Sequence, residues 1–147
     1  MQTEIRPLTE EDLDRVCELE ESAFSMPWKK EDFKHLIEDD NSVYLVISED
    51  NYIVGCAGYS FNGFEGYINN VVVDASYRNK GYAKALLTEV LKQGNEAGVK
   101  EYTLEVRVSN SAAIALYEGL GFKSEGIRKR FYEQPIEDAH VMWLRGN

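Results

Sequence analysis

Cysteine is scarce in this sequence: Cys17 and Cys56 are the only two among 147 residues, and they lie far apart. Two cysteines at this separation exclude a disulfide framework and a cysteine-based zinc site. No apolar run is long enough to span a membrane. The first six residues have neither the basic start nor the apolar stretch of a signal peptide. The sequence therefore predicts a soluble, cytoplasmic protein without a metal.

Basic residues are also in the minority, with 16 Lys and Arg against 26 Asp and Glu and a formal net charge of −10. Such a chain repels nucleic acid unless it carries a local basic patch, which argues against direct binding of DNA or RNA. A basic peptide or an amine is the kind of partner that this charge favours at long range. Repeats and linkers are absent, so residues 1–147 are expected to form one domain.

The spacing of apolar residues switches between the strand period and the helix period along the chain. Asn69 and Asn70 are poor strand formers inside a strand that ends in three valines, which suggests a β-bulge near them. The pattern predicts an α/β architecture with a strand–helix–strand unit in its middle. Strands are expected at about residues 4–8, 43–47, 52–59, 65–74, 101–107, 122–131 and 138–144, and helices at about 9–24, 29–39, 80–97 and 110–120.

A group of cations lies between the valine-rich strand and the helix that follows it. Arg78, Lys80 and Lys84 stand at the start of this helix. Cations there oppose the helix macrodipole, so their placement in an acidic protein indicates a bound anion. Backbone N–H groups at the helix start would bind the anion, and Gly81 would let phosphate oxygens approach the main chain. The alternative is an ordinary helix start with solvated cations.

Residues 78–83 read Arg-Asn-Lys-Gly-Tyr-Ala, which lacks the Gly-Lys-Ser/Thr ending of a P-loop and the three-glycine dinucleotide fingerprint. They match R-x-x-G-x-G/A, and thus resemble the turn that holds the pyrophosphate of acetyl-CoA in the GNAT superfamily. The third glycine of that turn is Ala83 here, a tolerated variant. The resemblance implies that acetyl-CoA is bound by the main chain of Val71, Val72 and Val73 and by Arg78, Asn79, Lys80, Gly81, Tyr82, Ala83 and Lys84.

Further motifs extend the resemblance over essentially the whole chain. The motifs are Ala-Phe-Ser-Met-Pro-Trp at 23–28, Glu-Val-Arg-x-Ser-Asn at 105–110, Leu-Tyr-Glu-x-x-Gly-Phe at 116–122 and Tyr-x-x-Pro with Glu-Asp-Ala at 132–139. In this order they resemble the RimI-type ribosomal protein alanine N-acetyltransferases. The resemblance implies a GNAT fold, a mixed central sheet of about six to seven strands flanked by about four helices. It also implies acetyl transfer from acetyl-CoA to the N-terminal alanine of a small-subunit ribosomal protein, with no metal and no covalent enzyme intermediate.

A base is needed because an amine attacks a thioester only in its unprotonated form. A peptide α-amine has a pKa of about 8, so a modest proton acceptor suffices. Glu105 lies on the strand face opposite Tyr102, Leu104 and Val106, and the matching glutamate of the family is the base, directly or through water. The alternative is a solvated strand carboxylate paired with Arg107 or with a cross-strand lysine.

An acid is needed because the reaction expels the CoA thiolate, whose thiol has a pKa of about 8.5, and a phenol of pKa about 10 is a reasonable donor. The resemblance assigns this role to Tyr117; the alternative is a core aromatic. Asn110 at the start of the same helix is a candidate N-cap. By resemblance it contacts the pantetheine arm.

For the acceptor, the resemblance places Met26, Pro27, Trp28 and Tyr132 along the peptide groove. Trp28 could equally be a hydrophobic lid on the core. The Tyr-Tyr pair of the family reads Phe131-Tyr132 here, so one hydroxyl of the peptide grip is missing. Two rival functions stay open: a GNAT enzyme acting on a small amine or a lysine side chain, and a CoA-binding domain without catalysis.

Overall fold

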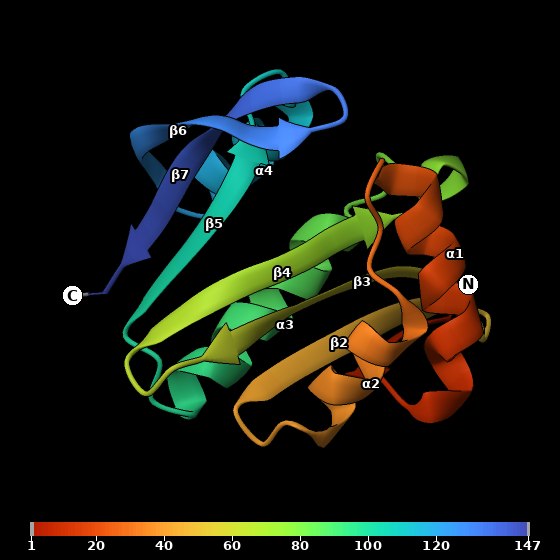
Figure 1. Cartoon of the computed structure of the whole chain (residues 1–147). Helices are drawn as coiled ribbons and strands as arrows, with labels where there is room; N and C mark the ends of the chain where they lie inside the picture. Colours follow the sequence, from red (N-terminus) through yellow and green to blue (C-terminus); the bar gives the residue numbers. More distant parts are fainter. Residues whose placement is uncertain (1, 147) are drawn as a thin grey trace.

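The computed structural model describes residues 2–146. Within these residues the chain forms one seven-stranded sheet and four α-helices (Figure 1). The strands are β1 (Thr3–Pro7), β2 (Ser42–Glu49), β3 (Tyr52–Phe61), β4 (Glu65–Val73), β5 (Glu101–Arg107), β6 (Lys123–Glu133) and β7 (Ile136–Arg145). The helices are α1 (Leu13–Ala23), α2 (Lys30–Glu38), α3 (Tyr82–Glu96) and α4 (Ser111–Gly119). The expected sheet of six to seven strands with about four helices is confirmed.

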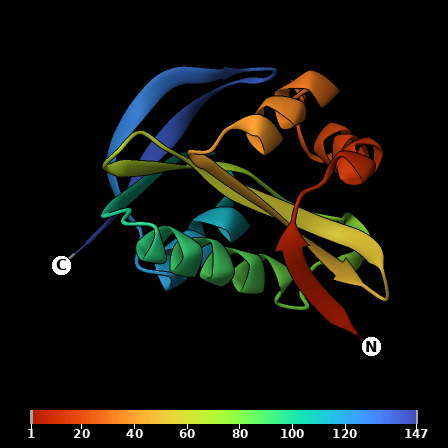
Figure 2. The ribbon, with the colours of Figure 1, turned by 90° about the horizontal axis from the view of Figure 1, so that it is seen from below.

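The helices cover both faces of the sheet, α1 and α2 on one and α3 and α4 on the other (Figure 2). Strand β2 shows why, because its side chains alternate between the two faces. Leu45 and Ile47 pack into the cluster under α3, whereas Tyr44 and Val46 pack into the cluster under α1 and α2. Among the helices of residues 2–146, none has the length and hydropathy that a transmembrane span requires.

The strand order β1-β2-β3-β4-β5-β7-β6 contains one parallel pair, β4 with β5. In the described chain this pair is limited to three positions, from Glu65 opposite Glu101 to Tyr67 opposite Thr103. Strand β5 stays paired with β7 along its whole length, from Glu101 to Arg107. Beyond Tyr67 the two parallel strands separate, and Figure 1 shows them diverging toward their carboxyl ends. The sheet is thus split in its middle.

The expected bulge lies on the diverging part of β4. Cys56 of β3 faces Val72, whereas Gly58 faces Asn69, so one residue of β3 stands opposite two residues of β4. A bulge of this kind bends its strand and disturbs the ladder on that strand. It therefore helps to turn the end of β4 away from β5.

Helix α3 begins later than the predicted residue 80. Asn79 and Gly81 have φ angles of 66° and 81°, which a right-handed helix cannot contain. Regular helix therefore starts at Tyr82, with Gly81 as its N-cap. Arg78 and Lys80 consequently belong to the loop before the helix, and only Lys84 lies in its first turn.

Candidate active site

A cavity of about 430 Å³ lies where β4 and β5 separate. Its walls come from these two strands, from α4, from the loop between α1 and α2, and from the β6–β7 hairpin. Seven of the residues predicted from the sequence line it together: Met26, Trp28, Val71, Glu105, Asn110, Tyr117 and Tyr132. The split in the sheet therefore collects candidate residues for donor, acceptor and proton transfer in one place.

Glu105 enters this cavity from β5 with both carboxylate oxygens engaged. The Tyr67 hydroxyl donates a hydrogen bond to Oε1, and Arg128 Nη1 lies 3.3 Å from Oε2. The side chain of Glu105 is 9% exposed. Arg107 is therefore not a partner of Glu105, although the sequence analysis considered an ion pair between them. Arg107 instead donates to the Pro135 carbonyl oxygen and to Glu137 in the hairpin. Two donors fix the orientation of the Glu105 carboxylate at the cavity wall.

Tyr117 reaches the cavity from α4. Its ring packs against Phe122 with the ring centroids 5.8 Å apart, and only 7% of the residue is exposed. The core-aromatic alternative therefore describes the ring correctly. Burial, with a smaller contribution from Tyr132, raises the pKa of the Tyr117 hydroxyl above its usual value. The phenol thus stays protonated at neutral pH and remains able to donate.

Asn110 is the N-cap residue of α4. Its side-chain Oδ1 accepts a hydrogen bond from the Ala113 N–H at 3.2 Å, which caps α4. The residue also lines the cavity. Its amide NH₂ group could therefore serve a ligand while the oxygen caps the helix.

The turn before α3 has the features of an anion site. A Cβ added to Gly81 would meet no atom within 4 Å, so the main chain is open to a ligand there. Ala85 N–H bonds to the Gly81 carbonyl oxygen, and the N–H groups before it belong to the helix start, which lacks intrahelical acceptors. These residues fit the diphosphate of CoA. The neighbouring valines of β4 differ in placement: Val71 lines the cavity, Val72 is buried in the core, and the Val73 carbonyl oxygen accepts from Arg78 Nε.

An acidic residue of β2 accompanies the basic turn. Glu49 accepts a hydrogen bond from the Tyr82 hydroxyl at 2.6 Å, and Lys80 Nζ lies 3.7 Å from the same carboxylate oxygen. This hydrogen bond is the main cause that raises the pKa of Tyr82 to about 12. Spacing along the sequence gave no sign of Glu49, because it approaches from a distant strand. One cation of the turn is therefore partly neutralised.

The loop between α1 and α2 forms a further wall of the cavity. Trp28 packs against Phe33 at a centroid distance of 5.4 Å, and its backbone N–H donates to the buried carboxylate of Glu20. Trp28 thus covers the core and lines the cavity at once. The sequence analysis did not predict a role for Glu20. The signal that could have found it is an acidic residue on the face of α1 where apolar residues are expected. Pro27 points elsewhere and lines a shallow depression beside Cys17.

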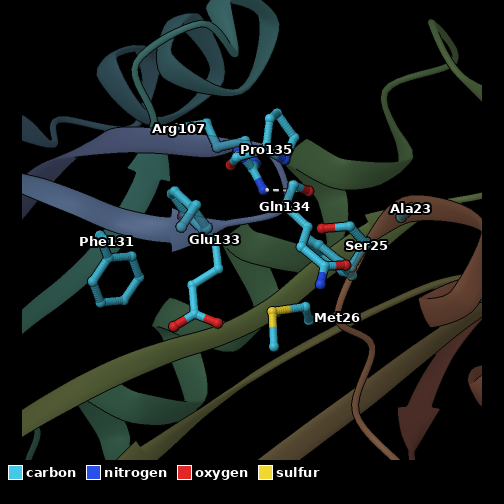
Figure 3. A pocket seen from close by; sticks show the side chains of 10 residues that line it. Ala23, Ser25, Met26, Arg107, Phe131, Glu133, Gln134 and Pro135 are labelled. Carbon is cyan, nitrogen blue, oxygen red and sulfur yellow. Dashed lines mark hydrogen bonds between the residues drawn. The ribbon is translucent and has the colours of Figure 1, made fainter.

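A second cavity of about 510 Å³ lies between this loop and the β6–β7 hairpin (Figure 3). Both cavities are lined by Met26, Arg107 and Tyr132. The Arg107 guanidinium stacks 4.3 Å from the centroid of the Tyr132 ring. Burial, and then the charge of Glu105, raises the pKa of Tyr132 to about 12. The two cavities thus adjoin along these shared residues and form a groove that leads from the β4–β5 split to the hairpin.

Comparison with known proteins identifies the family. The pattern of the acetyltransferase (GNAT) family matches residues 13–122. The chain belongs to the GNAT family. It is 34% identical to the [ribosomal protein bS18]-alanine N-acetyltransferase of Haemophilus ducreyi, over 95% of this chain and 98% of that protein. It is also 34% identical to the N-alpha-acetyltransferase RimI of Mycobacterium tuberculosis, over 94% and 89%.

Solved GNAT structures agree with this membership. The crystal structure of the ribosomal-protein-S18-alanine N-acetyltransferase from Escherichia coli has a TM-score of 0.89 and 31% identity, covering 98% of this chain and 94% of that chain. As a GNAT enzyme, the protein is an acetyl-CoA-dependent N-acetyltransferase. The expected family and fold are therefore confirmed. The turn at 78–84 and the split between β4 and β5 fit the two parts of the donor, its diphosphate and its extended arm.

Proposed function

We propose that residues 1–147 act as one domain that acetylates the α-amine at a protein N-terminus. The acceptor we propose is the N-terminal alanine of a small-subunit ribosomal protein in the cytoplasm. The names of two relatives support the acceptor, since one is an N-alpha-acetyltransferase and the other a [ribosomal protein bS18]-alanine N-acetyltransferase. Both cysteines are free thiols, the usual state in a reducing compartment. The observation that carries the proposal is the pair of adjoining cavities that leads from Glu105 to the β6–β7 hairpin.

The donor is held by the elements around the split. Main-chain groups of residues 78–84 would hold the diphosphate at the start of α3, with Arg78 and Lys84 adding charge. The open edge of β4 at residues 71–73 would hydrogen-bond the pantetheine arm, and Asn110 would contact it from α4. Acetyl-CoA supplies the thioester whose acetyl group is transferred.

The proton steps would use two side chains of the first cavity, Glu105 and Tyr117. Glu105 takes a proton from the acceptor ammonium, directly or through water, so that the free amine can attack the thioester carbon. The new bond is C–N, and the bond that breaks is C–S. Tyr117 protonates the departing sulfur or donates a hydrogen bond to it, and burial favours its protonated form. No covalent enzyme intermediate is needed, because the donor and acceptor sites would adjoin where the two cavities share lining residues.

The test compares three peptides: one with a free N-terminal alanine, the same peptide with a blocked N-terminus and an internal lysine, and a small amine. We expect transfer to the α-amine and little to the lysine. In Glu105→Gln we expect kcat to fall about 100-fold, because the base is lost, with acetyl-CoA affinity unchanged by calorimetry. Preferred acetylation of the lysine or of the small amine would overturn the proposed acceptor.

A further inference from the structure

Glu133 places a carboxylate in the second cavity. It is the last residue of β6, immediately before the turn of the hairpin. Figure 3 shows its side chain extending into the cavity between the Phe131 ring and Met26. The carboxylate therefore faces the groove in which the proposed acceptor peptide lies.

This carboxylate differs from its acidic neighbours because, within residues 2–146, it has no hydrogen-bond or ion-pair partner. Glu105 is held by Tyr67 and Arg128, and Glu137 binds Arg107 and the Ser109 N–H. Over residues 2–146, by contrast, no hydrogen bond or ion pair reaches the side chain of Glu133. The other charge in the cavity, Arg107, is committed to the hairpin carbonyls and to Glu137. The cavity thus offers one uncompensated negative charge.

The surroundings of Glu133 are apolar and exposed. Phe24, Met26 and Phe131 are 38%, 57% and 39% exposed, respectively, and all three line the cavity. Long cationic side chains bury an apolar stem and keep a charged head at the end. A lysine or an arginine would therefore place its stem against these side chains and its head against Glu133.

The charge distribution of the whole chain points the same way. Residues 2–50 hold 15 of the 26 acidic residues but only 5 of the 16 basic ones. The remaining residues carry equal numbers of both, so the entire formal excess of negative charge lies in the segment that contains β1, α1, α2 and β2. The loop that forms one wall of the cavity connects two of these elements. Their field favours a cation in this groove.

We infer that Glu133 determines substrate specificity, an inference that rests on the proposed function. It selects acceptor proteins that carry a lysine or an arginine among residues 2 to 5, downstream of the acetylated N-terminus. The class of substrate is therefore a basic N-terminal segment, and the subsite is the hairpin side of the groove.

The test uses peptides that begin with alanine and are otherwise uncharged. A single arginine is moved through positions 2 to 5, and a glutamine at the same position serves as the neutral reference. With the native enzyme we expect arginine to raise kcat/KM about fivefold or more at one of these positions. Glu133→Gln should abolish that preference, and Glu133→Lys should favour glutamate at the same position.

The matched control is Glu118→Gln, which removes the same charge from an exposed residue of α4 outside both cavities. It should keep the preference. Equal rates for arginine and glutamine at all four positions would overturn the inference, as would a preference that survives Glu133→Gln. In both cases the α-amine would still be acetylated, so the proposed function would stand. No transfer to any α-amine would overturn both.

Discussion

At the scale of single residues, the best defined feature is the attachment of Glu105. Tyr67 is the last residue of β4 that is paired with β5, and its hydroxyl donates a hydrogen bond to Oε1 of Glu105. Burial, and then this hydrogen bond, raises the pKa of Tyr67 above its usual value. The phenol therefore remains a donor, and we assign Tyr67 the role of a positioning residue for the proposed base.

Tyr67→Phe removes this hydrogen bond and leaves the ring. We expect kcat to fall about tenfold, because the carboxylate is no longer held in one orientation, while KM for acetyl-CoA stays unchanged. The matched control is Tyr52→Phe, since Tyr52 is exposed on β3 and its ring contacts Arg15 and Tyr77 outside the cavity. An unchanged kcat in Tyr67→Phe would remove Tyr67 from the mechanism.

The raised pKa of Tyr117 makes a prediction about alkaline pH. A phenol is protonated below its pKa, and burial moves that pKa upward from about 10. The proposed acid should therefore remain active from pH 8 to about pH 10. We expect kcat at saturating substrates to stay level over this range, with circular dichroism as the check on folding. A fall in kcat with a midpoint below pH 9 would contradict Tyr117 as the acid.

At the scale of elements, the start of α3 depends on two successive departures from helical geometry. Asn79 and Gly81 have positive φ, which delays the start of regular helix until Tyr82. The cost is local backbone strain at Asn79, of the kind found at functional sites. The β4 bulge is an irregularity of a different kind, and together with this turn it lies near the end of β4 at the proposed donor site.

Gly81→Glu should abolish acetyl-CoA binding, because it adds bulk and negative charge where phosphates are expected. Gly98→Glu is the matched control: Gly98 has a φ of 98° and open space around it, but lies at the other end of α3. Both changes carry a similar backbone cost of about 1 kcal/mol. Isothermal titration calorimetry should find binding in the control alone. Equal affinity in the two variants would exclude the turn as the diphosphate site.

At the scale of the whole molecule, the sequence was sufficient for the order of elements, for their inward faces and for the basic turn. These features are local, since they depend on periodicity and on neighbouring residues. The sequence was not sufficient to predict the hydrogen-bond and ion-pair partners of Glu105 and Lys80. Tyr67, Arg128 and Glu49 reach these side chains from other strands, and their approach depends on register and on the separation of β4 from β5.

The same limit explains Glu133. Its position in a hairpin was visible in the sequence, but its distance from the helix–helix loop was not, because the two segments are more than 100 residues apart. The clustering of negative charge in residues 2–50 was countable from the start. Its meaning required the fold, which brings the loop between α1 and α2 to the same groove as the hairpin.

The split between β4 and β5 also bears on the risk that unpaired backbone groups pair with another protein molecule. A sheet edge with unpaired N–H and C=O groups is a template for another chain and thus for aggregation. Here the separation creates two additional edges inside the sheet, and each is screened by the other and by the α1–α2 loop and the hairpin. The enzyme thereby keeps main-chain groups free for a small ligand while denying them to a strand of a neighbouring molecule.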